Sequence, residues 1–501
     1  MIVKIIMLVV FFTIMISVGF LCKKKSNDVN SFVLGGRGVG AWLSAFAYGT
    51  SYFSAVIFIG YAGQFGWKFG LASTLIGVGN ALIGSLFAWK ILAKRTRLMS
   101  QKLNSSTMPD FFGKRFDNHK LRTISSLIIF IFLIPYTASL YNGLSRLFSM
   151  AFNVDYSICI IVMAILTGIY VVSGGYLATA INDFIQGIIM LFGISAVIIA
   201  VLNVNGGLLN SITSMSLMSD PTLNASAGDF TSILGADPLS LISVIFLTSF
   251  GTWGLPQMVQ KFYSIKDEKA IKIGTVISTL FALVVAGGCY FLGGFGRLFA
   301  TTEEVSEFGY DFIVPKMLEG LSPFLIGVIV ILVLSASMST LSSLVMASSS
   351  TLSLDFINAN RKVKMNEKQK LTLIKIFIII FITISVIIAI IQHSSSVTFI
   401  AQLMGISWGS LAGAFLAPYL LSLYSKKITS SSVLINFIFS TTVMILNMIC
   451  PNIFPSLLKS PINCGALCML LGFAIVPIIS TFTSKLDDKV IENCFECIEQ
   501  N

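Results

Sequence analysis

The sequence predicts an all-α polytopic membrane protein with about 13 transmembrane helices. Three observations predict this fold class: 55% of the 501 residues are hydrophobic, only 11% are charged, and apolar runs recur along the whole chain. A soluble domain carries roughly a quarter charged residues, so lipid has to be part of the solvent of this chain. Each run approaches the about 20 apolar residues that cross a bilayer. No polar stretch remains that could build a soluble domain.

The apolar runs are expected to span the membrane within a single transmembrane domain over residues 1–484, followed by a short cytoplasmic tail over 485–501. The first run is followed at once by Lys23, Lys24 and Lys25, which places its N-terminus outside. No small-residue cleavage site follows it, so it is expected to remain as a membrane helix. The thirteen runs lie near residues 2–22, 42–62, 69–93, 123–150, 156–177, 183–203, 238–261, 271–298, 322–350, 372–392, 397–424, 430–450 and 463–483.

The distribution of Lys and Arg supports this topology. Counted in alternation from an external N-terminus, cytoplasmic loops hold about 25 of these residues and external loops about four, as the positive-inside rule requires. One cytoplasmic loop is expected to run from Lys261 to Lys272. The net charge of +11 therefore reflects membrane orientation, and nucleic acid is not an expected partner. The Ile-, Lys-, Asn- and Ser-rich composition suggests a bacterium with an AT-rich genome, and hence the plasma (inner) membrane.

The eight cysteines do not predict a disulfide framework, because most of them lie inside apolar runs. Cys494 and Cys497 form a C-x-x-C in the tail, a spacing found in redox and metal sites. The chain has no second C-x-x-C, and its two histidines are far apart in sequence. The tail pair is therefore expected to be two reduced thiols.

Two internal repeats are expected in the middle of the chain. Aligning Gly49 with Gly251 gives an offset of about 200 residues, which also carries span three onto span eight and span four onto span nine. Repeat one then covers about 42–203 and repeat two about 238–424. Each repeat holds five spans, so the second enters the membrane from the opposite side. Inverted repeats are typical of secondary transporters.

Two of the expected spans contain residues that break helices. Span two carries Gly, Thr, Ser and Tyr over Ala47–Ala55, and span seven carries two glycines and Pro256 within Phe250–Gln257. Proline frees a backbone carbonyl and glycine tolerates an unwound turn. Unpaired backbone inside a membrane is tolerated where it lines a cavity or a ligand, so paired breaks predict a binding site at the midplane. The alternative is helix packing through small residues.

Span nine contains a run of hydroxyl side chains over Ser335–Ser343. Ser339, Ser342 and Ser343 are three and four residues apart, so they share one helix face. Na⁺ is a hard cation that is bound by oxygen atoms, and these hydroxyls with carbonyls freed in span two would supply them. Isolated serines more often bond to their own helix, but six hydroxyls in nine residues exceed what that explanation requires.

Asp183 opens span six, and acidic residues in or beside a span are usually functional. The alternative is a helix cap at the cytoplasmic surface, since Asp is a favoured capping residue.

Together these motifs resemble the sodium:solute symporter family. The pieces that carry the resemblance are Phe32–Arg37 before span two, Asn182–Gln186 at span six, Gly254–Gln257 in span seven and Met338–Ser342 in span nine. They follow the family's order and spacing over nearly the whole chain. The resemblance implies thirteen spans, an external N-terminus and a five-plus-five inverted-repeat core of the LeuT type.

The resemblance also implies where Na⁺ would bind. The main site would use the backbone carbonyls of Thr50 and Phe53 in span two with the carbonyl of Ala336 and the hydroxyls of Ser339 and Thr340 in span nine. Sialic-acid-transporting members have a second Na⁺ site, whose positions are matched here by Asp183, Ser342 and Ser343. One or two Na⁺ per cycle therefore remain open.

The substrate is expected to be a small organic anion or an amino acid. The proline branch of the family has an acidic residue where this chain has Tyr52 and a tryptophan where it has Thr248, and both departures count against proline. The pantothenate branch has tyrosine at the first position and shares a Gly-Leu-Pro run, which places pantothenate or another monocarboxylate slightly ahead. The expected pocket residues, with ordinary helix contacts as the alternative for each, are Tyr52, Ser54, Tyr136, Thr252 and Trp253.

The expected function is Na⁺-coupled import of a small solute by alternating access. A proton-coupled carrier with Asp183 as its titrating group is one alternative, and a membrane sensor on a transporter-like domain is another. An enzyme is not expected, because the sequence shows no nucleophile–base pair, metal cluster or phosphate-binding loop.

Overall fold

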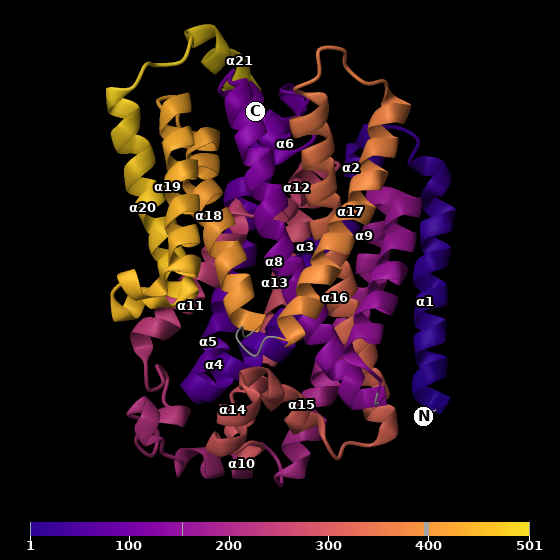
Figure 1. Ribbon diagram of the computed structural model, residues 1–501, viewed down its shortest axis with the longest axis vertical. Coiled ribbons are helices and arrows are strands. Elements are labelled where there is room, and N and C mark those ends of the chain that lie inside the picture. Colours follow the sequence, from indigo (N-terminus) through magenta and orange to yellow (C-terminus); the bar gives the residue numbers. More distant parts are fainter. Residues whose placement is uncertain (1, 153, 395–399, 500–501) are drawn as a thin grey trace.

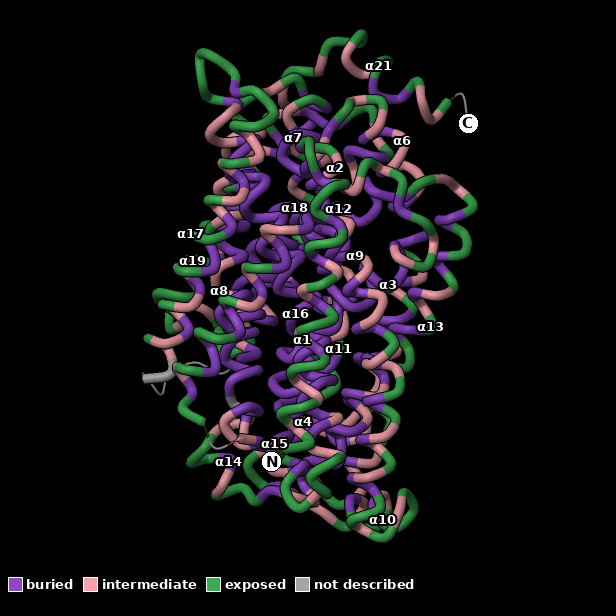
Figure 2. Tube along the Cα trace, turned by 90° about the vertical axis from the view of Figure 1, so that its right-hand side faces the viewer, coloured by how far each residue is buried: buried purple, intermediate pink, exposed green. Residues whose placement is uncertain are grey.

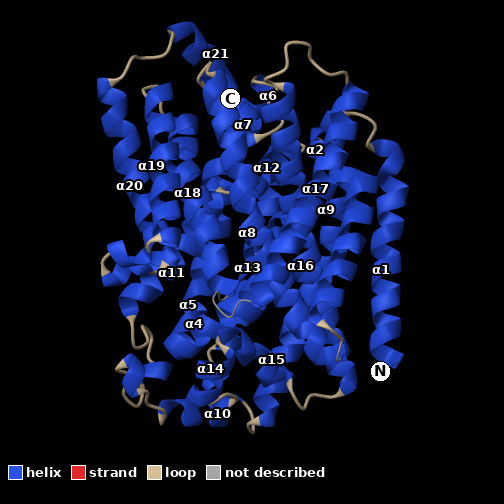
Figure 3. Ribbon diagram, viewed as in Figure 1, coloured by secondary structure: helices blue, strands red, loops and turns tan. Residues whose placement is uncertain are grey.

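The computed structural model describes residues 2–152, 154–394 and 400–499, which form helices and loops without a β-strand (Figure 3). Most of the longer helices run along the long axis of the molecule, side by side in one bundle (Figure 1). The N-terminal end of α1 (Ile2–Cys22) and the last helix, α21 (Asp488–Glu499), lie at opposite ends of this axis (Figure 1). The predicted all-α membrane fold is confirmed.

The helices between α1 and the long loop after residue 204 include three π-helical stretches, at Val56–Tyr61, Asn80–Phe87 and Trp89–Ala93. Their bounds are α2 (Val29–Leu34), α3 (Ala41–Tyr52), α4 (Ala62–Phe69), α5 (Thr74–Gly79), α6 (Lys94–Lys102), α7 (Met108–Arg115), α8 (His119–Phe152) and α9 (Tyr156–Val204).

The second part of the chain begins with a surface loop that contains α10 (Leu208–Ser216) and continues into further long helices. Their bounds are α11 (Pro238–Phe250), α12 (Pro256–Ser264), α13 (Glu268–Gly293), α14 (Thr302–Phe308), α15 (Ile313–Leu318), α16 (Pro323–Thr351), α17 (Glu367–Ser394), α18 (Ile400–Tyr424), α19 (Ser430–Ile449), α20 (Pro461–Phe482) and α21 (Asp488–Glu499).

Short polar side chains in the loops fix where many helices begin. Asp155 accepts a hydrogen bond from the backbone N–H of Ser157 at the start of α9. Asp237 does the same for α11, and Asp267 does the same for α13. Such caps satisfy backbone donors that have no partner inside the helix. The sequence therefore sets these helix starts locally, before any packing.

Ten helices among the described residues are long and apolar enough to cross a membrane, or eleven if the bent pair Pro238–Gly254 and Pro256–Ser264 is one span. Two of the segments that pass, Val56–Lys102 with 47 residues and Tyr156–Val204 with 49, are much longer than the about 20 residues a bilayer requires. The second of them, α9, is interrupted at Gly175, whose φ of 58° and ψ of −157° are not helical. The count of 13 spans stays a prediction, as do the boundaries of the two repeats.

The helices differ in how far other helices surround them. In the most apolar 18-residue stretch of α18, 94% of the residues are buried. In that of the segment Pro323–Asn358, which contains α16, 78% are buried. The corresponding share is 22% in the N-terminal segment that contains α1, which lies at the edge of the bundle. Figure 2 shows buried residues through the interior of the bundle and exposed residues along its outer helices and at both ends. Apolar side chains on the outer helices would therefore face lipid, while α16 and α18 form the centre.

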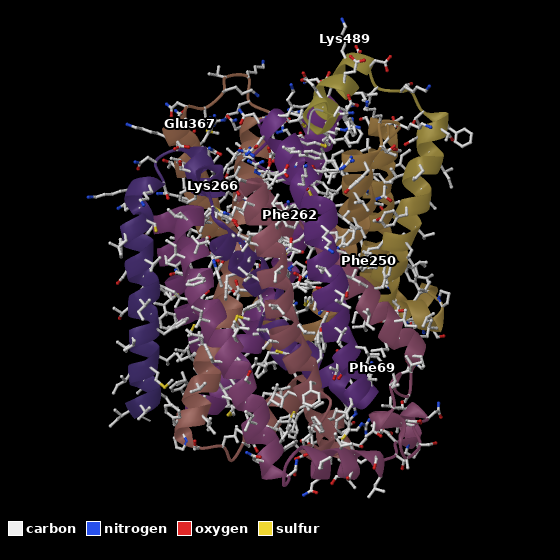
Figure 4. All side chains as sticks on the ribbon, turned by 180° about the vertical axis from the view of Figure 1, so that it is seen from behind. Phe69, Phe250, Phe262, Lys266, Glu367 and Lys489 are labelled. Carbon is white, nitrogen blue, oxygen red and sulfur yellow. The ribbon has the colours of Figure 1, made fainter. Side chains whose placement is uncertain are left out.

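Both predicted helix breaks are present. α3 ends at Tyr52, and Phe53 is extended (φ −106°, ψ 116°) before the π-helical stretch that leads into α4. The second break separates α11 from α12, which are bent by 47° and joined through the 3₁₀ turn Gly251–Gly254. Phe250 and Phe262 mark the two arms of this broken helix in Figure 4.

At the end of the molecule where α10 lies, a buried ion pair holds the long surface loop against the helices. Arg297 donates to a carboxylate oxygen of Asp220 at 2.8 Å and to the carbonyl of Trp67 at 2.8 Å. Its guanidinium also lies 4.2 Å from the ring centre of Trp67 and 4.0 Å from that of Phe230. Arg297 therefore joins this loop to the ends of α4 and α13.

At the opposite end, the C-terminal segment folds back onto the bundle as α21. The ring of Phe495 lies 4.9 Å from the guanidinium of the buried Arg115, and Lys102 pairs with Glu496. Cys494 is buried and Cys497 is half-buried in this helix. The predicted tail is thus a docked helix, and neither Cys494 nor Cys497 forms a disulfide within the described residues.

Candidate functional site

The break in α3 lies against the hydroxyl-rich part of α16. Ser339 donates to the carbonyl of Thr50 at 3.0 Å, and Thr340 donates to the same carbonyl at 3.3 Å. Both hydroxyls also lie 3.1 Å from the carbonyl of Ala336 one turn earlier in α16. Thr340 further contacts the carbonyl of Ser51 at 3.4 Å. Five oxygen atoms from two distant segments are therefore gathered at one buried point.

Four of the five residues predicted for the main Na⁺ site, Thr50, Ala336, Ser339 and Thr340, meet here. Phe53 is buried and caps the C-terminal end of α3 beside the cluster. The α16 hydroxyls bond to the carbonyls of Thr50 and Ser51 and not to that of Phe53. Phe53 therefore stays a predicted ligand.

The chemistry of this oxygen cluster suits a monovalent hard cation. Its donors are three carbonyl and two hydroxyl oxygens, all neutral. Hard cations prefer oxygen ligands, and sites for divalent ions usually add carboxylates. In the described part of the chain, no group of three or more His, Cys, Asp or Glu residues could hold a metal ion. The residues present therefore fit Na⁺.

A second polar cluster lies on the α12 side of α16 and contains two opposite charges. Asp183 of α9 has 0% of its surface exposed, and Lys261 of α12 has 2%. The Lys261 ammonium lies 3.7 Å from an Asp183 carboxylate oxygen and donates to the Ser343 hydroxyl at 2.8 Å. Ser343 shares a further hydrogen bond of 2.7 Å with Ser51 of α3. The cluster therefore connects α3, α9, α12 and α16.

Two expectations from the sequence change at this cluster. Lys261 was expected to begin a cytoplasmic loop, and that is wrong, because its side chain is buried in the interior. A lysine near the end of an apolar run looks in sequence like one whose amine reaches the surface, and only packing distinguishes the two. The capping alternative for Asp183 is also not what the structure shows, since this residue lies well inside α9. Ser342 bonds to the carbonyl of Ser339 in its own helix at 2.9 Å.

Aromatic side chains surround the space beside the first break. Tyr52 and Tyr136 both pack against Trp408 of α18, with ring centres 6.1 Å and 5.9 Å apart. The side chains of Ser54 and Trp408 are the polar neighbours of the Tyr136 hydroxyl. The Ser54 and Tyr136 hydroxyls and the Trp408 indole N–H are buried and make no hydrogen bond within the described residues. Three donors are therefore available to a ligand at this place.

The remaining predicted pocket residues make contacts within the protein. Trp253 donates its indole N–H to the carbonyl of Ile83 at 3.1 Å. Thr252 donates to the carbonyl of Ser249 at 2.9 Å. The hydroxyl of Tyr52 likewise donates to the carbonyl of Thr248 at 2.5 Å. These hydrogen bonds stabilise the packing around the two helix breaks. The role of these residues in binding a substrate stays a prediction.

Sequence reasoning missed Trp408, Lys261 and Asn80 as members of the site. Asn80 lies in the π-helical stretch after α5 and accepts hydrogen bonds from Thr248 at 2.9 Å and Ser249 at 3.1 Å. A signal for Trp408 exists in the small and polar residues around it, Gly405, Ser407, Gly409 and Ser410. Such a run in the middle of an apolar span resembles the runs at the two breaks.

Comparisons with known proteins agree with this geometry. The model of the sodium:solute symporter family matches residues 32–440. Sodium/proline symporter 2 of Staphylococcus saprophyticus is 28% identical over 447 residues, which cover 88% of this chain and 85% of the relative. The osmoregulated proline transporter OpuE of Bacillus subtilis is 27% identical over 432 residues, 84% of each chain.

Solved structures share the fold. A Na⁺-coupled sialic acid symporter in a substrate-bound outward-open state aligns with 97% of this chain and 98% of its own, with a TM-score of 0.75 and 16% identity. The inward-facing form of Mhp1 aligns with 91% of this chain and 94% of its own, with a TM-score of 0.50 and 12% identity. These are transporters of the LeuT fold, the core that the resemblance implied.

Proposed function

The chain belongs to the sodium:solute symporter family, and from this premise we propose that it imports proline, or a compact amino acid like it, together with Na⁺. The relatives named above are proline transporters, and they match nearly the whole chain. This evidence reverses the order drawn from single positions, which placed pantothenate slightly ahead. Similarity over more than 400 residues outweighs the departures at Tyr52 and Thr248.

The observation that carries the proposal is the oxygen cluster between α3 and α16. Its oxygen atoms come from segments that are far apart in the sequence. Thr50 and Ser339, for example, are separated by 289 positions. Na⁺ bound there would hold the broken end of α3 against α16. Loss of Na⁺ to the cell interior would leave the carbonyl of Thr50 and its neighbours with only the α16 hydroxyls as partners. Occupancy of the cluster would thus bias the packing of α3 on α16, which is how a bound ion couples to a conformational change.

The buried groups beside Trp408 support a substrate that carries a carboxylate. A carboxylate only accepts hydrogen bonds, and the three groups without partners at Ser54, Tyr136 and Trp408 can all donate. The rings of Tyr52, Tyr136 and Trp408 provide apolar faces that suit the ring of proline. Pantothenate also has a carboxylate, but its longer polar chain would require more partners than these aromatic rings supply.

Burial of the predicted pocket supports an alternating-access mechanism. Tyr52, Ser54, Tyr136, Thr252 and Trp253 are all buried in this structure, so a substrate reaches them only when helices move apart. We propose that the bundle of predicted spans two, three, seven and eight rocks against predicted spans four, five, nine and ten. The oxygen cluster lies on the boundary between these two groups, because α3 belongs to the first and α16 to the second.

Uptake into proteoliposomes tests the proposal. Radiolabelled proline, pantothenate, a short monocarboxylate and a sugar are offered with an inward Na⁺ gradient or with K⁺ in its place. We expect Na⁺-dependent accumulation of proline, and little accumulation of the other three. Accumulation of pantothenate in preference to proline would contradict the proposed substrate but not the coupling. Equal uptake in Na⁺ and K⁺ would contradict the coupling.

Proton coupling is a second candidate, and the buried Asp183 favours it, because neither of its oxygens accepts a hydrogen bond among the described residues. The two couplings predict different outcomes for Ser339→Ala and Thr340→Ala. If Na⁺ is the coupling ion, both variants raise the Na⁺ concentration for half-maximal uptake at least tenfold, the equivalent of one lost bond of about 1.4 kcal/mol. If protons drive uptake, both variants leave its ion dependence unchanged.

A further inference from the structure

The cluster around Lys261 has the composition of a cation site. The carboxylate of Asp183 and the hydroxyl of Ser343 both lie beside the Lys261 ammonium, and the hydroxyl of Ser51 bonds to that of Ser343. Neither oxygen of Asp183 accepts a hydrogen bond within the described residues. Carboxylate and hydroxyl oxygens are the ligands that a hard cation takes. A buried carboxylate also requires a positive partner, since an isolated buried charge is strongly unfavourable.

In this chain the positive partner is part of the protein. The Lys261 ammonium lies within the cluster, 2.8 Å from the Ser343 hydroxyl and 3.7 Å from the Asp183 carboxylate. It also lies over the ring of Tyr176, 5.2 Å from the ring centre. Its three N–H donors need oxygen partners, as a bound cation needs oxygen ligands. Phe262, the next residue of α12, is also buried, and Figure 4 labels it.

We infer that Lys261 is a tethered cation in the place that a second coupling Na⁺ would otherwise occupy, so that the carrier takes up one Na⁺ per substrate. The inference rests on the proposed function, because it concerns the number of Na⁺ ions coupled to import. It selects between the one-ion and two-ion cycles that the sequence leaves open at Asp183, Ser342 and Ser343.

The position of the tether has a mechanistic consequence. Lys261 belongs to α12, in predicted span seven, whereas Asp183 and Ser343 belong to α9 and α16. A diffusible ion at this point would leave toward the cytoplasm in each cycle. An ammonium fixed to α12 stays, and it moves only as far as α12 moves against α9 and α16. The charge at this cluster is therefore never transported.

The experiment counts bound Na⁺ on the purified, lipid-reconstituted protein by equilibrium binding of radioactive Na⁺. We expect one Na⁺ per wild-type chain and two per Lys261→Met chain, because methionine fills a similar volume without the charge. Adding Asp183→Asn to Lys261→Met should return the count to one, since the carboxylate is then gone. The exposed Lys266, five residues further along and labelled in Figure 4, provides the matched control. Lys266→Met should bind one.

Each outcome decides. Two Na⁺ per wild-type chain would overturn the inference and leave Na⁺ coupling intact. One Na⁺ per Lys261→Met chain would also overturn it, because the pair with Asp183 would then be structural. If Lys261→Met does not fold, the double variant, which buries no unpaired charge, and the wild-type count still test it. No bound Na⁺ in the wild type, together with no effect of Ser339→Ala, would instead overturn the proposed function from which the inference starts.

Discussion

The hydroxyl of Tyr136 is a buried donor without a partner in the described structure, and it adjoins Trp408 and Ser54. Leaving such a group unsatisfied is unfavourable, so it indicates a ligand that completes the hydrogen bonding. Tyr141 lies further along the same helix, and its buried hydroxyl also makes no hydrogen bond there. Comparing the two hydroxyls separates substrate recognition from general effects of polarity in α8.

We expect Tyr136→Phe to raise the KM for proline about tenfold. A hydrogen bond to a charged group contributes about 1.5–3 kcal/mol, and 1.4 kcal/mol corresponds to a factor of ten. The Na⁺ concentration for half-maximal uptake should change little, because the hydrogen bonds of the oxygen cluster between α3 and α16 do not involve Tyr136. Initial rates of uptake at varied proline and Na⁺ concentrations measure both. Tyr141→Phe is the control, and an equal rise in KM there would contradict a role specific to Tyr136.

The buried ion pair of Asp220 and Arg297 predicts a defined pH dependence of stability. Burial raises the pKa of Asp220, but hydrogen bonds from Thr222 and Arg297 and the charge of Arg297 lower it overall. A lowered pKa means that the pair stabilises the fold above the unfolded carboxyl pKa of about 3.9. This stabilisation is lost as the pH falls through the lower pKa of the folded state.

Asp220→Asn should therefore lower the free energy of unfolding by about 3 kcal/mol at neutral pH, because Arg297 stays buried without its anion. Thermal unfolding of both proteins in detergent between about pH 7 and about pH 2 measures the difference. We expect the two melting temperatures to converge as the pH falls, since protonation removes the charge of Asp220 in the wild type. A difference that is constant with pH would show that shape rather than charge matters here.

Among the helices, α4 and α13 approach each other so closely that only glycine fits. A Cβ atom on Gly293 would lie 2.1 Å from the carbonyl oxygen of Ala62, and one on Gly66 would lie 2.0 Å from the carbonyl oxygen of Gly293. Because these contacts are with backbone, no side chain can move aside. Small residues at helix crossings are how membrane helices pack tightly. In this way α4, beyond the first break, is held to α13.

Gly293→Ala should lower the free energy of unfolding by about 1–3 kcal/mol, the usual effect of overpacking. Gly287 lies in the same helix and is also buried, but a Cβ there would meet nothing within 4 Å. Gly287→Ala is therefore the matched control, and we expect it to be neutral or slightly stabilising, because alanine favours a helix. Melting temperatures of the two variants in detergent give the comparison. Equal destabilisation would contradict the importance of the α4 contact.

For the molecule as a whole, the cysteines offer a test of orientation. Cys450 is exposed between α19 and α20, and Cys494 and Cys497 lie in α21, which follows α20. An external N-terminus and thirteen spans place Cys450 outside and the tail in the cytoplasm. Burial raises the pKa of the Cys494 and Cys497 thiols, so less reactive thiolate is present at each.

A membrane-impermeant maleimide should label Cys450 in intact cells, and it should label the half-buried Cys497 slowly and only after permeabilisation. Mass spectrometry of the labelled peptides identifies each site, with Cys450→Ser as the control for signal outside the membrane. Cys22, Cys159, Cys289, Cys464 and Cys468 are buried and should stay unlabelled. Rapid labelling of the tail in intact cells would contradict the predicted orientation.

The sequence predicts the parts of this site that follow from local pattern. The breaks at Phe53 and Gly251–Gly254 were predictable because glycine, proline and hydroxyl residues are out of place in an apolar span. The broken span two and the hydroxyls of span nine suggested a shared site, but the choice of Thr50 as a partner of Ser339 came from the family resemblance, since pattern does not reveal which carbonyl is freed. Lys261 and Trp408 were missed because their roles come from packing among α9, α12, α16 and α18. No rule for a single span reports that packing.

With one Na⁺ per substrate, the membrane potential and the Na⁺ gradient limit how far the carrier can concentrate its substrate inside the cell. Movement of one Na⁺ into the cell releases about 2.3 kcal/mol of free energy per 100 mV of membrane potential. At 1.4 kcal/mol per factor of ten, that potential alone supports roughly fifty-fold accumulation of a zwitterion. A carboxylate without a compensating amine would lose this contribution, because its own negative charge moves inward as well. The tethered ammonium of Lys261 therefore suits a carrier of amino acids better than a carrier of anions.

The break between α11 and α12 also brings the ends of two helix dipoles together. α11 continues into the 3₁₀ turn Gly251–Gly254 and ends at the break, and α12 begins there with Pro256 and without a side-chain cap. A helix carries about half a positive charge at its N-terminus and half a negative charge at its C-terminus. The break thus brings partial charges of both signs together inside the bundle, and they are opposite in sign to the amine and carboxylate of an amino acid that would face them. An uninterrupted helix would place those partial charges at opposite membrane surfaces, out of reach of any substrate.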